Sequence, residues 1–438
     1  MRKFLPVLGL FFLSMNVQSQ FQFSGEANVQ GQYSSGEELP FWMYHNKRGR
    51  VSENTNVAGW VTGKLDYELN YYSSLEFGAG ILYQDAIADK IFLDEIYASY
   101  KREFFEITAG RKQQEELYNG LSSSNKNILW SLNPRPIPGI QIRTRKPVFF
   151  YRGSTLGFEG SWNEYFLEAD RHVSAAKLHH KRFLLVLEPN ERWTFKGGGQ
   201  HFVQWGGTSQ TRGDQPEKFE DYIKNITGQT AISGGAGRHI GGYEAHAKRS
   251  FRDFSLEFFY NYQFESTSGI LLRNIPDGRY GLFYETRDED RIVNSVIYEF
   301  TYTLNQGVNF GSPGEDYFNN GIYRSGWTYE NRVLGSPFFT ESSTGEGIVN
   351  NRFIAHHIGI GGQFSDYFVS YPYKLILSYS SNKGTHAVPF EPGHKMMALY
   401  SEFGLFRNFV ELDLQFAAEF NTFTSPLFGI GMLVKKSF

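Results

Sequence analysis

The stretch FSLEFFYNYQFE, residues 254–265, alternates between two kinds of side chain over its whole length. One register holds only aliphatic or aromatic residues, from Phe254 to Phe264, whereas the other holds Ser, Glu, Asn and Gln beside a single Phe259. A period of two predicts a β-strand whose two faces lie in different environments. Strands of soluble proteins usually span about five or six residues, whereas about 9–11 tilted residues cross a bilayer. The stretch therefore predicts a transmembrane strand.

The same alternation recurs elsewhere in the chain. In FVELDLQFAAEF (409–420) the register from Val410 to Phe420 is apolar, and the other carries Glu411, Asp413 and Glu419. IYASYKREFFEITAGRK (96–112) is typical of a hairpin of two such strands. Because ionised carboxylates are costly to bury in a dry core, the polar face must meet water or polar groups. A soluble β-sandwich is the alternative, but the long strands favour a membrane barrel.

The composition limits the classes of function. The 438 residues carry a formal net charge of −3 and no Cys. The charge gives no electrostatic reason to expect a nucleic-acid partner. Without Cys there is no disulfide framework and no thiolate metal site. The 41 Phe, 27 Tyr and 46 Gly suit strands, tight turns and the aromatic girdles of a membrane barrel.

The N-terminus has the pattern of a secretory signal. Arg2 and Lys3 precede an apolar run over residues 4–13, and the small residues Val17 and Ser19 suit cleavage before Gln20. An uncleaved anchor helix is the alternative, but the run is too short to span a bilayer. No run of about 18 apolar residues follows, so we expect no transmembrane helix. We therefore expect a signal peptide over 1–19 and one outer-membrane barrel domain over 20–438.

The strand number follows from the chain length. About 420 mature residues, at roughly 23 per strand and loop, correspond to 16–18 strands, and bacterial barrels usually have an even number. We expect an antiparallel barrel of 18 strands. The last strand, FGIGMLVKKSF, ends at Phe438 and resembles the assembly signal of outer-membrane barrels. We therefore expect recognition by the barrel-assembly machinery, contacts with outer-membrane lipid, and a monomer.

One segment departs from the strand pattern. DQPEKFEDYIKNITG (214–228) places Phe219, Tyr222 and Ile226 at helical spacing, with Pro216 suited to a first turn and Gly228 to a stop. It predicts one short amphipathic helix in a long loop, resting on the barrel mouth or plugging it. A packing helix without a ligand is the simpler interpretation.

Enzyme motifs are missing from the sequence. It contains no GxSxG, P-loop or HExxH pattern. The adjacent pairs His179–His180 and His356–His357 would point to opposite faces of a strand and could not readily chelate one metal. We expect no enzyme activity, cofactor or metal, although a hydrolase built from scattered Ser, His and Asp remains open.

Four loop-like stretches carry more aromatic and basic residues than loops need: PFWMYHNKRGRVSENTN (40–56), NPRPIPGIQIRTRKP (133–147), HFVQWGGTSQTRG (201–213) and DYFNNGIYRSGWTYENRVLGSPF (316–338). In this order they resemble the Wzi-type capsule assembly proteins of the outer membrane, in the form common in Bacteroidetes. The resemblance covers nearly the whole mature chain. It implies an 18-stranded barrel that acts as a surface lectin, helps anchor exported capsular polysaccharide, and is neither an enzyme nor an open pore.

One departure from the family limits what the resemblance implies. Enteric members carry an additional N-terminal helical bundle on the periplasmic side. Here strand-like sequence, FQFSGEANVQGQY, starts at Phe21, directly after the expected signal. We therefore do not carry over a periplasmic handover role.

The chemistry of the four stretches is compatible with a lectin. Sugar rings pack their C–H faces on aromatic rings, and uronic acids suit bidentate Arg. The candidate polysaccharide-binding residues are Trp42, Arg135, Trp205, Tyr323, Arg324 and Trp327. Two other interpretations compete, because barrels place aromatics at their interfaces regardless of ligand and Trp205 begins what could be a tight glycine turn. The rival function is a channel for sugars or other small solutes; the lectin hypothesis predicts a blocked lumen and the channel an open one.

Overall fold

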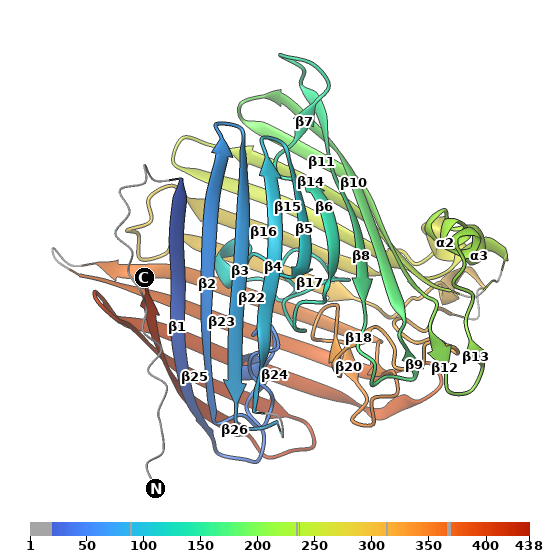
Figure 1. Ribbon diagram of the computed structural model, residues 1–438. Coiled ribbons are helices and arrows are strands. Elements are labelled where there is room, and N and C mark those ends of the chain that lie inside the picture. Colours follow the sequence, from blue (N-terminus) through green and yellow to red (C-terminus); the bar gives the residue numbers. More distant parts are fainter. Residues whose placement is uncertain (1–19, 88–89, 234, 236, 312–313, 366–368) are drawn as a thin grey trace, which may run out of the picture.

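The chain forms a closed antiparallel β-barrel (Figure 1). The computed structural model describes residues 20–87, 90–233, 235, 237–311, 314–365 and 369–438. The expected signal peptide, residues 1–19, lies outside the described residues. The main sheet has 19 segments, and one of them, the two-residue β7, is an appendage of β8. The remaining 18 strands form the wall, which confirms the predicted strand number.

The bounds of the elements are as follows. The wall strands are β1 Phe21–Ser34, β2 Val57–Asn70, β3 Ser73–Gln84, β4 Ile91–Arg102, β5 Phe105–Arg111, β6 Gly139–Thr144, β8 Leu156–Phe166, β10 Lys177–Asn190, β11 Trp193–Trp205, β14 Arg238–Ser250, β15 Phe254–Phe264, β16 Gly278–Thr286, β17 Ser295–Tyr302, β22 Phe353–Ser365, β23 Ser370–Gly384, β24 Pro389–Arg407, β25 Glu411–Asn421 and β26 Leu427–Ser437. Short strands outside this wall are β7 Val148–Phe149, β9 Val173–Ser174, β12 Thr208–Ser209, β13 Gly213–Asp214, β18 Thr328–Tyr329, β19 Arg332–Val333, β20 Thr340–Glu341 and β21 Ile348–Asn350. The helices are α1 Phe41–Tyr44, α2 Phe219–Ile226, α3 Gln229–Ser233 and α4 Thr267–Ile270, with 3₁₀ turns at Tyr118–Gly120 and Val308–Phe310. Over the described part of the chain, no helix has the length and apolar character needed to cross a membrane.

Each wall strand pairs with its neighbour in the chain, and β1 pairs with β26 to close the barrel. The closure extends to the last residue. The backbone N–H of Gly25 donates to the carbonyl of Phe438 at 2.8 Å, and the N–H of Phe438 donates back to Gly25 at 3.0 Å. The Phe438 ring stacks on Phe23 with 5.9 Å between centroids. The terminal aromatic residue therefore belongs to the seam of the barrel.

The apolar register faces outward and the polar register faces the lumen. In β15, Phe258 is 49% exposed, whereas Phe259 is fully buried and Glu257 is 8% exposed. In β26, Phe428, Ile430 and Met432 are all about half exposed. A soluble β-protein has the opposite arrangement, with its apolar register inside. Residues 254–265 therefore alternate because one face of the strand meets lipid outside the wall and the other meets polar groups inside it.

The two ends of the barrel differ. At one end, here called the turn end, strands are joined by short turns such as residues 71–72, 103–104 and 191–192. At the other, the loop end, the connections are as long as residues 206–237 and 303–352. Bacterial barrels have short periplasmic turns and longer extracellular loops. By this rule the loop end faces the cell exterior.

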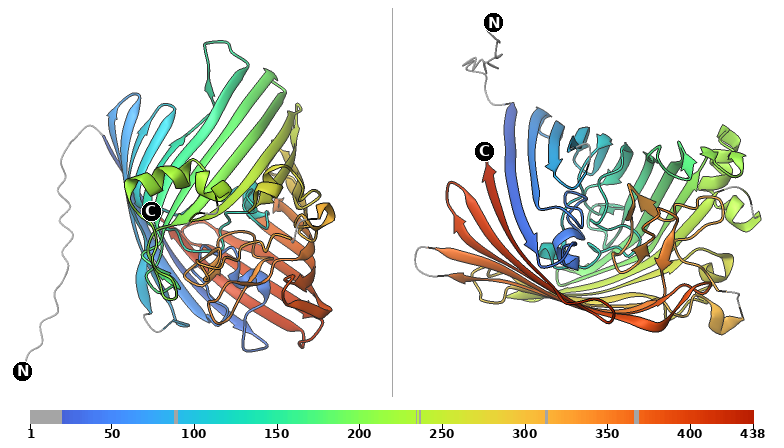
Figure 2. Two further views of the ribbon diagram at one scale, coloured as in Figure 1. Left: turned by 90° about the vertical axis from the view of Figure 1, so that its right-hand side faces the viewer. Right: turned by 90° about the horizontal axis from the view of Figure 1, so that it is seen from below.

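Three loops fold into the lumen and form what we call the plug: residues 35–56, 112–138 and, within 303–352, the described residues 303–311 and 314–352 (Figure 2). Their apolar side chains join lumenal wall residues in one buried hydrophobic cluster. Trp42, Leu129 and Trp327 come from the three loops, and Phe202 and Tyr400 from strands β11 and β24 of the wall. The lumen is thus occupied by the protein's own loops, as the lectin hypothesis predicts.

The loop helix α2 forms as predicted, but not where we expected it. It lies on the outer face of the wall (Figure 1). The Tyr222 ring contacts the outward-facing Trp205 at 5.2 Å between centroids, and its hydroxyl donates to Glu164 at 2.6 Å. The expectation that the helix plugs or rests on the mouth is therefore wrong. The plug already fills the lumen, whereas Tyr222 of α2 packs on outward-facing Trp205.

Candidate functional site

The four sequence motifs, far apart in the chain, converge on the plug. The ring of Phe41 stacks on Phe338 at 5.7 Å between centroids, so the first and fourth motifs meet. Gly49, at φ +65°, lies against Arg135, where a Cβ would come within 2.8 Å of the Arg135 backbone nitrogen. The first motif therefore needs a glycine where it crosses the second.

Trp42, from helix α1, is anchored inside the barrel. Its side chain is 4% exposed. The indole N–H donates to the Ser378 hydroxyl of β23 at 3.0 Å, and the ring meets Phe338 and His357 edge-on. The main chain of the same helix is held by Glu419, whose carboxylate accepts the Phe41 N–H at 3.0 Å. Trp42 thus fastens the first loop to the wall.

Trp327 and Tyr323 are also buried. Trp327 has no exposed surface; its indole N–H donates to the Leu129 carbonyl at 2.8 Å, which joins two loops of the plug. The ring packs edge-on against Phe202 at 5.1 Å. Tyr323 is 1% exposed and donates its hydroxyl to the Gly206 carbonyl at 3.2 Å, so the fourth motif holds the third.

Arg135 and Trp205 lie at the margins of the plug and the wall. Arg135 pairs with Glu330 at 2.7 Å and donates to the Leu93 carbonyl at 2.6 Å, with its side chain 15% exposed. Trp205 is 7% exposed beneath α2 and carries the Lys177 ammonium 4.8 Å above its ring. Gly206 and Gly207 follow it at φ +65° and +81°. The unusual backbone angles expected for a glycine turn in this motif are therefore present.

Arg324 is the one candidate with an open side chain. It is 43% exposed at the loop end and pairs with Glu346, itself 56% exposed, at 3.0 Å. Nearby, Asn331 is exposed and its side chain lies beside Gly345. We call Arg324, Asn331 and Glu346, together with His172 and Thr211, the loop-end surface.

His172 and Thr211 extend this surface away from Arg324. The backbone N–H of His172 donates to the hydroxyl of Ser325, the residue after Arg324, at 2.9 Å. The His172 ring nitrogen Nε2 lies 3.3 Å from the Thr211 hydroxyl. The loop-end surface therefore offers a cation, a carboxylate, an amide, a hydroxyl and an imidazole. Sequence reasoning identified only Arg324 among them. His172 and Thr211 come from other loops that meet it only in the folded barrel, and Asn331 and Glu346 approach it only through the folding of their own loop.

Three carboxylates, here called the carboxylate cluster, fasten the largest loop to its neighbour; Asp277 and Glu315 are buried, and the side chain of Glu265 is 13% exposed. Glu265 accepts the Phe318 N–H at 2.5 Å, and Asp277 accepts the Tyr317 hydroxyl at 2.8 Å. Glu315 accepts the backbone N–H of Glu265 at 2.7 Å.

Burial is the main influence on these three groups. It raises the pKa of Glu265 to about 7, against the opposing effect of Arg238. Burial also raises the pKa of Asp277 to about 6, although two backbone N–H groups oppose the rise. The pKa of Glu315 is raised for the same reason. No local sequence pattern indicates the cluster, since its members are spread over two connections, residues 265–277 and 303–352.

A polar cavity of about 710 Å³ lies in the lumen at the turn end. Charged groups of both signs line it, including Glu285, Glu402, Lys374 and Arg407. Leu121, from the second loop of the plug, bounds it on the inner side. The cavity is the feature of the lumen closest to what a channel would need.

The histidine pairs divide between the two faces of the wall, as expected. His180 stacks on lumenal Phe202, while His179 pairs with outward-facing Glu164. His357 is buried in the lumen and His356 is exposed. In the part of the chain that the structure describes, no group of three or more His, Cys, Asp or Glu side chains could hold a metal ion.

Comparison with known proteins adds a family and a fold. A family model described as capsule assembly protein Wzi matches residues 18–358. No curated protein is similar to the chain in sequence. Among solved structures, the chain is similar to Wzi of Escherichia coli, described as an outer-membrane, carbohydrate-binding β-barrel involved in group 1 capsule assembly. The TM-score is 0.62 and the sequence identity 11%, and the alignment covers 94% of this chain and 83% of that one.

Two further barrels are similar in fold. OccK3 of Pseudomonas aeruginosa has a TM-score of 0.53 at 8% identity, covering 95% of each chain. OccAB4 of Acinetobacter baumannii has a TM-score of 0.51 at 8% identity, covering 96% of this chain and 99% of that one. At these identities the likeness concerns the fold alone. The family match and the barrel fold together locate the chain in the outer membrane.

Proposed function

The chain belongs to the Wzi family of capsule assembly proteins, and from that premise we propose that it binds exported capsular polysaccharide at the loop end and helps anchor it to the cell surface. The role is that of a lectin, without catalysis. The protein acts as a monomer, and the barrel-assembly machinery recognises its last strand. The similar Wzi of Escherichia coli is itself described as carbohydrate-binding.

The plug is the single observation that carries this proposal. Three loops fill the lumen with one hydrophobic cluster, so the barrel is built as a platform rather than a passage. Trp42, Tyr323 and Trp327 lie inside that cluster. We therefore propose that these three residues hold the loop end rigid from below. A binding surface supported in this way loses less entropy when a ligand binds.

The residues that contact sugar directly in this proposal are those of the loop-end surface. Arg324 offers a planar group with several N–H donors, which suits the carboxylate of an acidic sugar. Its partner Glu346 is exposed and accepts hydrogen bonds from sugar hydroxyls. Asn331 and Thr211 add neutral donors and acceptors. Arg135, which pairs with Glu330 next to Asn331, is a secondary contact in the proposal. Trp205 supports the loop that contains α2 from beneath this helix.

Binding of purified polysaccharide tests the proposal. The protein is reconstituted in liposomes, and capsular polysaccharide from the producing strain is titrated while binding is measured by co-sedimentation. Saturable binding that an excess of the same polysaccharide displaces, and that an unrelated neutral glucan does not, is the expected result. Binding equal to that of protein-free liposomes would contradict the proposal.

The channel remains the rival function because of the polar cavity at the turn end. A channel requires this cavity to continue past Leu121 to the loop end. The lectin proposal requires the plug to separate them. Conductance therefore distinguishes the two.

A further inference from the structure

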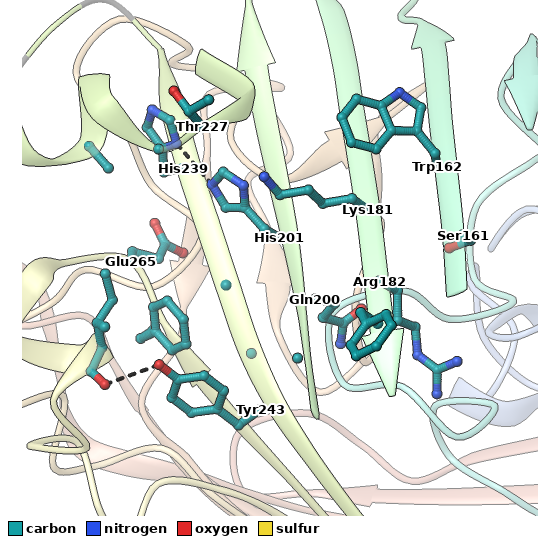
Figure 3. Close-up of a pocket in the computed structure, with 18 of the residues that line it drawn as sticks. Ser161, Trp162, Lys181, Arg182, Gln200, His201, Thr227, His239, Tyr243 and Glu265 are labelled. Carbon is teal, nitrogen blue, oxygen red and sulfur yellow. Dashed lines mark hydrogen bonds between the residues drawn. The ribbon is translucent and has the colours of Figure 1, made fainter. Parts of the chain in front are cut away.

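The outer wall of the barrel carries an apolar groove that the proposed function does not use (Figure 3). Its volume is about 670 Å³. Strands β8, β10, β11 and β14 form its floor, and the connections that contain α2–α3 and α4 form its sides. The faces of these strands are fixed by contacts. Gln200 and Arg182 bind lumenal groups, so their neighbours Gly199, Lys181 and Phe183 point outward.

The floor of the groove is deep because its outward positions are glycines. Gly160 and Gly199 line it without a side chain to fill the space, whereas the ring of Phe264 already covers Gly241. Around them stand aromatic side chains that face lipid on the same side of the wall: Trp162, Phe183, Tyr243 and Phe264. Phe183 is 51% exposed and Trp162 40%. The groove is thus continuous with the lipid-facing surface of the barrel.

Polar groups gather at only one end of the groove. Lys181, His201 and His239 lie near the loop-end termini of their strands, and Figure 3 shows Lys181 and His201 side by side. Lys181 donates to the Ile226 carbonyl at the end of α2, which leaves further ammonium hydrogens free to bind. His239 is engaged on both ring nitrogens, by His201 at 3.0 Å and Thr230 at 2.7 Å.

Along the wall, the polar groups of the groove are followed by apolar ones, which matches the polar and apolar parts of an amphiphilic molecule. Phe183 and Gly199 lie two residues farther from the loop end than Lys181 and His201. A molecule in the groove would therefore place its polar part towards the membrane surface and its apolar part towards the bilayer centre. A lone phosphate would leave the apolar part of the groove empty, and a peptide would need backbone partners that this floor does not offer.

We propose that the groove holds one hydrocarbon chain of a phosphate-bearing lipid from the leaflet at the loop end. The chain lies over Gly160 and Gly199, between the rings of Phe183 and Tyr243. The phosphate accepts hydrogen bonds from Lys181 and His201. Because α2 and α3 cover one side of the groove, bound lipid stabilises the loop that they form against the outer wall.

A matched pair of glycine substitutions tests the chain position. Gly160→Phe fills the groove, and a Cβ at this position meets nothing nearer than the Arg182 carbonyl at 3.5 Å. Gly197→Phe adds the same ring on the same outward face outside the groove, where the nearest atom is 3.9 Å away. Each protein is purified with added dioleoylphosphatidylglycerol, and retained lipid is counted by native mass spectrometry.

We expect the native chain and Gly197→Phe to retain one lipid, and Gly160→Phe to retain at least fivefold less. Faster mobility in unheated detergent gels confirms that each barrel is folded. Equal retention by the two variants would overturn the proposal, as would the absence of retained lipid on the native chain.

A second substitution tests the phosphate position. Lys181→Gln should lower the retention of dioleoylphosphatidylglycerol at least threefold and leave the retention of uncharged dioleoylglycerol unchanged. An equal effect on both lipids, or on neither, would overturn the assignment of Lys181 to the phosphate.

The chain has no Cys, so Ala231→Cys carries a single dye beside the groove. Lipid with brominated chains should quench this dye more than a dye at Gly197→Cys, and equal quenching would contradict the chain position.

Discussion

Arg324 and Trp327 stand three residues apart but have opposite surroundings. Trp327 is enclosed by rings from two loops and the wall, whereas Arg324 reaches solvent at the loop end. Both residue types suit sugar recognition, so residue type alone could not separate them. Burial does separate them, because a ring with no exposed surface cannot stack on a sugar without moving the plug.

Replacing Arg324 tests the contact surface at the scale of one residue. We expect Arg324→Ala to weaken polysaccharide binding roughly tenfold, since a hydrogen bond to a charged group is worth about 1.5–3 kcal/mol. The control is Arg152→Ala, which removes an exposed Arg at the turn end. Co-sedimentation titrations measure both. Equal affinities of the two variants would contradict the role of Arg324.

Replacing Trp327 tests its structural role. We expect Trp327→Ala to destabilise the fold by about 3–5 kcal/mol, because it leaves a large cavity inside the plug. Trp327→Phe keeps an aromatic ring but loses the hydrogen bond to the Leu129 carbonyl, so its effect should be smaller. Urea unfolding in detergent measures both variants. Unchanged stability of Trp327→Ala would show that the plug does not depend on this ring.

At the scale of elements, the strands were predictable and the loops were not. Alternation is a local property, so the outward register of β15 and β26 could be predicted from the sequence. The helical spacing of α2 was equally local, but its position depends on Trp205, which lies in a preceding strand. The plug and the loop-end surface need contacts between distant loops, and no local pattern encodes these.

The carboxylate cluster predicts a pH dependence of the loop it fastens. The pKa of Glu265 is about 7 in the folded protein, against an ordinary value of 4.5. Between these values the folded state holds a proton that the unfolded chain releases, so stability falls as pH rises. The contribution is fully present below pH 4.5 and is lost as pH approaches 7. The raised pKa of Asp277 acts in the same direction.

Protease resistance of the loop over residues 303–352 measures this effect. From pH 5 to pH 7.5 the native chain should lose more resistance than Glu265→Gln, in which the side chain cannot ionise. Glu346→Gln, which changes an exposed carboxylate of the same loop, should behave like the native chain. The same pH dependence in Glu265→Gln as in the native chain would contradict the assignment.

At the scale of the whole molecule, the plug predicts a barrel that does not conduct. The native protein should produce no conductance steps in planar bilayers. Strands β17 and β22 are neighbours, so a short Gly-Ser linker can replace residues 317–349 without breaking the wall. This variant should open stable conductance steps. Replacement of residues 217–229, which lie outside the wall between the neighbours β11 and β14, is the control and should not conduct. Conductance of the native protein would favour the channel.

The partition of capsule between cells and medium tests the central claim most directly. The gene is deleted in a strain that makes capsule, and polysaccharide is quantified on washed cells and in the medium. We predict that total polysaccharide is unchanged, that it shifts from cells to medium, and that the restored gene reverses the shift while the Arg324→Ala gene reverses it only in part. An unchanged partition after deletion would contradict the proposed role in surface attachment.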